Sequence, residues 1–88
     1  YICQNFAMRV IGDIPHHQMK ITVFSWNNKY HIKFEIGQFE QTYKIGSMDL
    51  MGMDDINKMI DEEFLDSIMQ RFLEMRTSFH GAFQRLNS

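Results

Sequence analysis

The sequence has few of the residues that cross-link or interrupt a chain: one cysteine, Cys3, and one proline, Pro15, among 88 residues. A single cysteine cannot form an internal disulfide, which excludes a small disulfide-stabilised scaffold and favours a reducing compartment. No apolar run approaches the roughly 18 residues that a membrane-spanning helix needs. We therefore expect a cytoplasmic protein with no membrane partner.

An excess of one charge is also lacking, because 9 basic residues face 11 acidic ones and the formal net charge is -2. Nucleic-acid-binding domains are usually basic overall. The length of 88 residues allows one domain. Because a domain of this size buries only about 60% of the surface that its unfolded chain exposes, dimerisation would add usefully to its stability.

The first half of the chain alternates in residue type as β-strands do. Strands are predicted for Met19 to Trp26 and for Lys29 to Ile36, joined at Asn27-Asn28 by a two-residue type I′ turn. Gly37-Gln38 is a second turn candidate, and a third strand is predicted for Phe39 to Ile45. The prediction is a three-stranded antiparallel β-meander with one apolar face.

The first turn fixes a register that sets Phe24 opposite His31 and Lys20 opposite Glu35. The face away from the apolar side then presents aromatic and basic side chains: Phe24, Trp26, His31, Lys20, Lys29, Lys33 and Lys44. Aromatic rings interleaved with lysines resemble the stacking platforms of proteins that bind single-stranded nucleic acids. The alternative is that Phe24 and Trp26 pack beneath residues 1–18 or against a second chain.

After the loop from Gly46 to Met53 the apolar period changes from two to about 3.6, which indicates helix. Asp54 is the predicted N-cap of a short helix. Asp61 either caps a second helix or lies on the surface of one continuous helix. A long amphipathic helix is predicted from about Glu62 to Leu86, with an apolar seam formed by Leu65, Ile68, Phe72, Met75, Phe79, Ala82 and Leu86. The predicted fold is α+β, with this helix packed on one sheet face.

The length of this helix leads to a functional prediction. At about 1.5 Å per residue the helix is roughly 37 Å long, whereas a strand of eight residues spans about 27 Å. The last apolar residues then have little beneath them in a single copy. The candidate interface consists of Phe24, Trp26, His31, Lys33, Phe72, Phe79, Phe83 and Leu86. We expect a non-catalytic interaction or homodimerisation module whose partner is a second copy or another protein, with single-stranded nucleic acid (RNA) as the alternative.

Residues 1–18 are predicted to form an N-terminal arm, and residues 19–88 a single domain. Disorder of this arm and pairing as an extra edge strand, from Phe6 to Ile11, are the two alternatives. Phosphate-binding glycine loops are absent, and His16-His17 has no cysteine or second histidine pair at zinc spacing. The acidic residues between 54 and 66 are explained by helix starts. We predict no catalytic residue, metal or cofactor; an enzyme hypothesis would depend on dispersed histidines and acids.

Two segments carry a resemblance to other sequences. The stretch from Met19 through Trp26-Asn-Asn-Lys-Tyr to Phe39-Glu-Gln-Thr-Tyr-Lys-Ile, followed by Asp61-Glu-Glu-Phe, resembles short uncharacterised proteins of Bacteroidota. The resemblance covers about residues 19–86. It implies a domain that starts at Met19, and it implies no activity.

Overall fold

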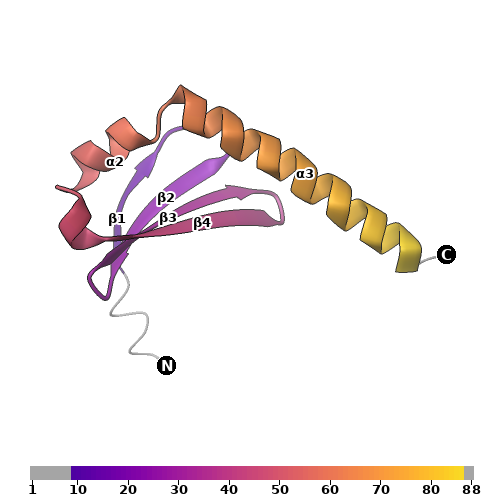
Figure 1. Cartoon of the computed structure of the whole chain (residues 1–88), viewed down its shortest axis with the longest axis horizontal. Coiled ribbons are helices and arrows are strands. Elements are labelled where there is room, and N and C mark those ends of the chain that lie inside the picture. Colours follow the sequence, from indigo (N-terminus) through magenta and orange to yellow (C-terminus); the bar gives the residue numbers. More distant parts are fainter. Residues whose placement is uncertain (1–8, 87–88) are drawn as a thin grey trace.

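The computed structural model describes residues 9–86 and shows an α+β fold with one open antiparallel sheet. The elements are β1 (Arg9–Ile14), β2 (Lys20–Trp26), β3 (Lys29–Ile36), β4 (Phe39–Gly46), the short 3-10 helix η1 (Ser47–Asp49), α2 (Met53–Met59) and α3 (Glu62–Leu86). The strands lie in the order β1-β2-β3-β4. Both α-helices lie on one side of the sheet (Figure 1).

The two tight turns follow the chemistry of their residues. Asn27 and Asn28 have φ angles of 55° and 61°, as a type I′ turn requires. The predicted register is confirmed, with Phe24 opposite His31 and Lys20 opposite Glu35. In the second turn Gly37 has a φ of 58°, the left-handed conformation that a type II′ turn needs at its first position. The two turns fix which side chains face the helices.

The prediction of three strands is wrong because a fourth strand, β1, pairs with β2. An extra edge strand was the alternative for residues 1–18, but it was expected at Phe6 to Ile11, and residues 1–8 lie outside the described part of the chain. The six residues of β1 include Gly12 and Asp13, which weaken a strand signal. The register also shifts between Val10 and Gly12, where Ile11 is the extra residue of a bulge.

Gly12 has a second role, at the contact between β1 and α2. A Cβ atom on this residue would lie 2.9 Å from Cε and 3.3 Å from Sδ of Met53. The absence of a side chain therefore allows Met53, the first residue of α2, to pack closely on the edge strand. This contact joins the N-terminal strand to the helical layer.

The helical region breaks at Asp61, which resolves the alternative that the sequence left open. The backbone N–H of Phe64 donates a hydrogen bond of 2.9 Å to the carboxylate of Asp61, so Asp61 is the N-cap of α3. The predicted N-cap at Asp54 is wrong, because α2 begins at Met53 after Gly52. In α2 the carboxylate of Asp55 instead accepts the backbone N–H of Met51 at 2.9 Å, one residue before the N-cap position at Gly52.

Replacing Asp61 by alanine is expected to lower the free energy of unfolding by about 1 kcal/mol, because the N–H of Phe64 would lose its acceptor. Urea denaturation followed by circular dichroism measures this. Asp61→Asn is the matched control, since asparagine caps helices about as well as aspartate. Equal stability of the alanine variant and the wild-type protein would contradict the assigned cap.

The core lies between the inner sheet face and the two helices. Its buried apolar residues are Met19, Ile21, Val23, Ile32, Phe34, Ile56, Ile60, Ile68 and Phe72. Gln41, the one polar residue on the inner face of β4, donates a hydrogen bond of 3.0 Å to the backbone carbonyl of Ile68. Arg71 donates to the hydroxyl of Tyr43 at 3.1 Å. These two contacts attach the first half of α3 to β4.

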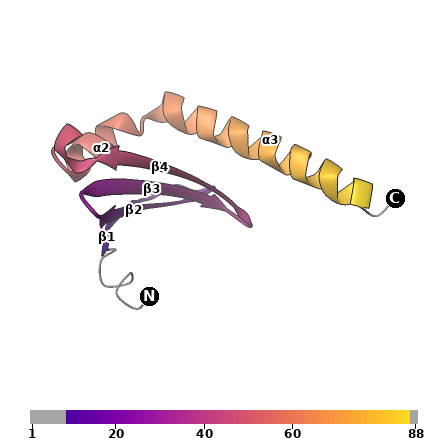
Figure 2. The same cartoon turned by 60° about the horizontal axis from the view of Figure 1, so that its bottom comes forward.

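The second half of α3 continues past the hairpin that joins β3 to β4 (Figures 1 and 2). The radius of gyration, 15.4 Å, exceeds the roughly 12 Å expected for a compact domain of this length. The molecule therefore has an extended end made of helix alone. This overhang is the one that the helix and strand lengths predicted.

Candidate functional site

The C-terminal end of α3 exposes large apolar side chains. Phe79 is 52% exposed, Phe83 54% and Leu86 78%. At 100° per residue these three continue the stripe formed by the buried Ile68 and Phe72. The ring of Phe79 meets that of Phe39 edge-on at a centroid distance of 5.8 Å and stacks on that of Phe83 at 6.4 Å. The aromatic row thus starts at the sheet and ends in solvent.

A groove opens beside this row, between the β3–β4 turn and the last turns of α3. Its volume is about 450 Å³, and it is lined by Gln38, Phe39, Arg76, Phe79, His80 and Phe83. Aromatic rings supply most of its surface, with Arg76 and His80 as its charged or titratable members. A groove of this shape accepts an apolar side chain from another molecule.

The outer sheet face holds a second group of candidate residues. Phe24 and Trp26 are half-buried on β2. The ammonium group of Lys33 lies 5.3 Å above the ring centre of Phe24, within cation–π range, and 3.9 Å from the carboxylate of Glu35. The ring of Trp26 leans on that of His31, with centroids 5.8 Å apart.

His31 is the buried centre of this face, although it points away from the core. Its side chain is 6% exposed and that of Thr22 is 7% exposed. Nε2 of His31 and Oγ1 of Thr22 are both buried, and neither has a hydrogen-bond partner among the described residues. Burial lowers the pKa of His31 below its ordinary value, and the positive charges of Lys44 and Lys29 lower it further. The folded structure therefore disfavours the protonated imidazole.

This shift predicts a pH dependence of stability. The unfolded chain binds a proton at His31 more readily than the folded one, so stability rises with pH in this range. The contribution is complete above the unfolded pKa of about 6.5 and is lost as the pH falls through the lower folded pKa. Urea midpoints between pH 5 and pH 7.5 should fall less steeply with acid in His31→Gln than in the wild-type protein; equal slopes would contradict the prediction.

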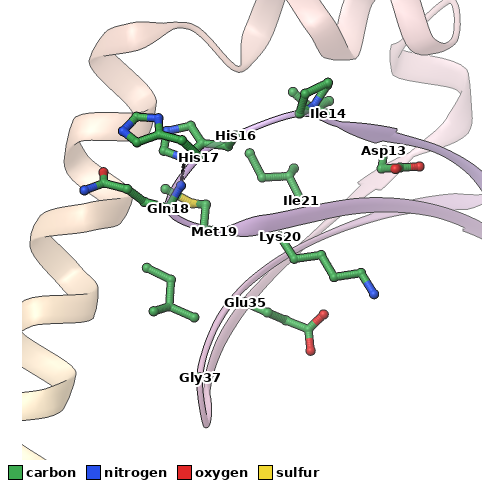
Figure 3. A pocket seen from close by; sticks show the side chains of 12 residues that line it. Asp13, Ile14, His16, His17, Gln18, Met19, Lys20, Ile21, Glu35 and Gly37 are labelled. Atoms are coloured by element: carbon green, nitrogen blue, oxygen red, sulfur yellow. Dashed lines mark hydrogen bonds between the residues drawn. The ribbon is translucent and has the colours of Figure 1, made fainter.

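A pocket of about 450 Å³ also lies at the loop between β1 and β2 (Figure 3). There the rings of His16 and His17 stack at 4.8 Å, and His16 Nδ1 accepts the backbone N–H of Gln18 at 3.1 Å. Figure 3 shows the side chain of Asp13 at the opposite end of the pocket from the imidazoles. The described residues show no hydrogen bond between either imidazole and a carboxylate, so a general-base pair is not assembled here.

Within residues 9–86, no three His, Cys, Asp or Glu side chains lie where they would hold a metal ion. Among the helices described, none is long and apolar enough to cross a membrane.

The structure divides the predicted interface residues into two surfaces and the core. Phe24, Trp26, His31 and Lys33 gather on the outer sheet face, and Phe79, Phe83 and Leu86 gather at the end of α3. Phe72 belongs to neither, because it is 4% exposed and packs in the core.

Phe39 is a site residue that the sequence did not predict. Its place at the start of β4, directly after a two-residue turn, was the available signal that it lies at the sheet end beneath the long helix.

Comparisons of the chain with family models, with curated proteins and with solved structures gave no match.

Proposed function

We propose that this protein is a non-catalytic protein–protein interaction module that assembles as a homodimer through the end of α3. The observation that carries the proposal is the row formed by Phe79, Phe83 and Leu86, each more than half exposed at the end of a helix that has left its sheet. Contiguous apolar patches of this kind mark interaction sites in soluble proteins. Covering them would also add apolar burial to a small core.

The groove and the apolar end of α3 beside it together favour a second copy of the same chain as the partner. In a two-fold arrangement the α3 end of each copy lies in the groove of the other, so that each supplies both the apolar side chains and the cavity. The match is apolar: the exposed rings at the end of α3 fit a groove whose walls include Phe39, Phe79 and Phe83.

The test is the mass of the protein in solution at micromolar concentration, measured by light scattering. We expect a dimer for the wild-type protein and a monomer for Phe83→Glu, because the substitution removes an apolar ring and places a charge that must lose its water when the interface forms. Full burial of one such side chain contributes about 1.5–3 kcal/mol, and Phe83 is already about half buried in one copy. The loss of two symmetry-related rings therefore removes about 1.5–3 kcal/mol and weakens a micromolar dimer by about 10-fold or more.

Thr77→Glu is the matched control, because Thr77 is exposed on the opposite side of the same helix and bonds only to the backbone carbonyl of Leu73. It adds the same charge and should leave the dimer intact. Circular dichroism shows whether Phe83→Glu keeps the fold. A wild-type monomer at this concentration, or equal effects of the two substitutions, would contradict a dimer at this surface.

A further inference from the structure

The outer sheet face combines rings and cations at one end. There the register brings together Phe24, Trp26, Lys29, His31, Lys33 and Lys44, which we call the basic aromatic patch. Of the acidic residues of this face, Glu35 and Glu40 pair in register toward the opposite end, near the β3–β4 turn, whereas Asp13 pairs with Thr22 in the same row as Lys33. The patch is therefore locally positive although the whole chain has a net charge of -2.

The patch also contains polar groups whose hydrogen-bonding capacity is unused. Nε2 of His31 lies buried without a partner between Lys44 on β4 and Phe24 on β2, and Oγ1 of Thr22 is likewise unpartnered two residues along β2. A buried polar atom without a partner in a free protein is costly. Because neither atom is exposed, a ligand reaches it only when the covering side chains, among them Trp26 beside His31, move, and the partner that the ligand then supplies offsets this cost. Phosphate and base-edge atoms supply both donors and acceptors.

A second copy of the same face is a poor occupant. A two-fold contact centred on the patch would set Lys29, Lys33 and Lys44 of one copy against the same lysines of the other, and like charges across an interface are unfavourable. An anionic partner is favoured instead. Phe24 and Trp26 are two residues apart on one strand and share one face, so they offer two successive rings to an extended chain of bases.

We infer that the basic aromatic patch binds single-stranded nucleic acid, with bases stacked on Phe24 and Trp26 and phosphates held by Lys29, Lys33 and Lys44. In the free protein Lys33 covers the ring of Phe24 and makes only a long ion pair with Glu35. On binding, its ammonium group moves from the ring to a phosphate, which leaves the ring to a base. Both helices lie on one side of the sheet (Figure 2) and the patch is on the outer face, so binding is independent of the proposed dimer.

Trp26 provides the readout, because it is the only tryptophan of the chain. Its fluorescence is titrated with a single-stranded oligonucleotide of mixed sequence, as RNA and as DNA. We expect quenching that saturates. Three phosphate contacts predict a slope of log K against log salt of about -2, which corresponds to about a 20-fold loss of affinity between about 50 and about 200 mM salt.

Matched variants locate the site. Lys44→Gln should weaken binding and make the slope shallower by about 0.7. Lys58→Gln removes the same charge from an exposed position on α2 and should change neither quantity. Phe24→Leu keeps an apolar side chain but removes the ring, and should lower the affinity about 5-fold or more. Circular dichroism confirms that each variant is folded.

Several outcomes would overturn the inference. One is the absence of saturable quenching at low salt. Another is a Lys58→Gln variant that weakens binding as much as Lys44→Gln, which would indicate unspecific attraction to positive charge. A third is equal affinity for polyglutamate, which would assign the patch to an acidic protein segment. Phe83→Glu leaves the basic aromatic patch intact, so nucleic-acid binding by this variant is measured separately. A protein that does not form the proposed dimer therefore does not affect this test.

Discussion

Replacing Phe34 by alanine is expected to lower the free energy of unfolding by about 3–5 kcal/mol. Phe34 is completely buried in the middle of β3, and its ring meets those of Tyr43 and Phe64 edge-on at centroid distances of 6.0 and 5.8 Å. It therefore connects two strands to the first turn of α3. The truncation removes a large apolar transfer energy and leaves a cavity that close neighbours fill only in part.

The magnitude matters because the whole domain has little stability to lose. At roughly 0.05–0.15 kcal/mol per residue, a chain of this length is stable by about 4–13 kcal/mol. Urea denaturation at 25 °C measures the loss, and Phe34→Leu is the control that keeps most of the volume and should cost clearly less. A loss below about 1 kcal/mol for the alanine variant would contradict a close-packed site at this position.

Replacing Phe72 by alanine is expected to have an effect of similar size, about 3–5 kcal/mol. Phe72 and Ile68 are the buried residues of α3, so the truncation weakens the attachment of the helix to the sheet. The sequence pattern does not distinguish a core residue from an interface residue here, because Phe72 and Phe79 lie on the same stripe of one helix. The size of the stability loss would distinguish them. Phe72 is covered by the sheet and Phe79 is half exposed.

The comparison needs a monomeric protein, so both alanine substitutions are made in the Phe83→Glu background. Phe79→Ala removes the same side chain and, since only about half of it is buried, should cost about 1–1.5 kcal/mol. Chemical denaturation followed by helix content gives both values. If the two variants lose equal stability, the assignment of Phe72 to the core is wrong.

The strands and turns that the sequence predicted are those in which local chemistry and burial agree. Asn27-Asn28 allows one tight turn, and the alternation on both sides of it leaves one register that keeps the apolar residues together. The cap at Asp61 was recognisable because an acidic side chain precedes a helix with more acids in its first turn. In both cases a few neighbouring residues decide the structure.

The errors arise where contacts from distant residues decide the structure. In β1 the flexible end of the Met53 side chain occupies the space beside Gly12, and that contact joins residues about 40 positions apart. The same glycine weakens the strand signal that would have predicted β1. Phe72 was assigned to the interface because helical periodicity gives the face of a residue but not the length of sheet beneath it. The sequence thus predicted an aromatic and apolar candidate site. Its division between two surfaces depends on how α3 packs on the sheet, which the sequence pattern does not give.

The bulge in β1 has a consequence for self-association at high concentration. An edge strand offers its free N–H and C=O groups to any other extended chain. At Ile11 the extra residue interrupts that row and turns the strand, so sheets of neighbouring molecules cannot join smoothly along this border. Strand-by-strand polymerisation is therefore blocked at the β1 side. A concentrated solution should remain clear of fibrils for as long as the bulge keeps its geometry.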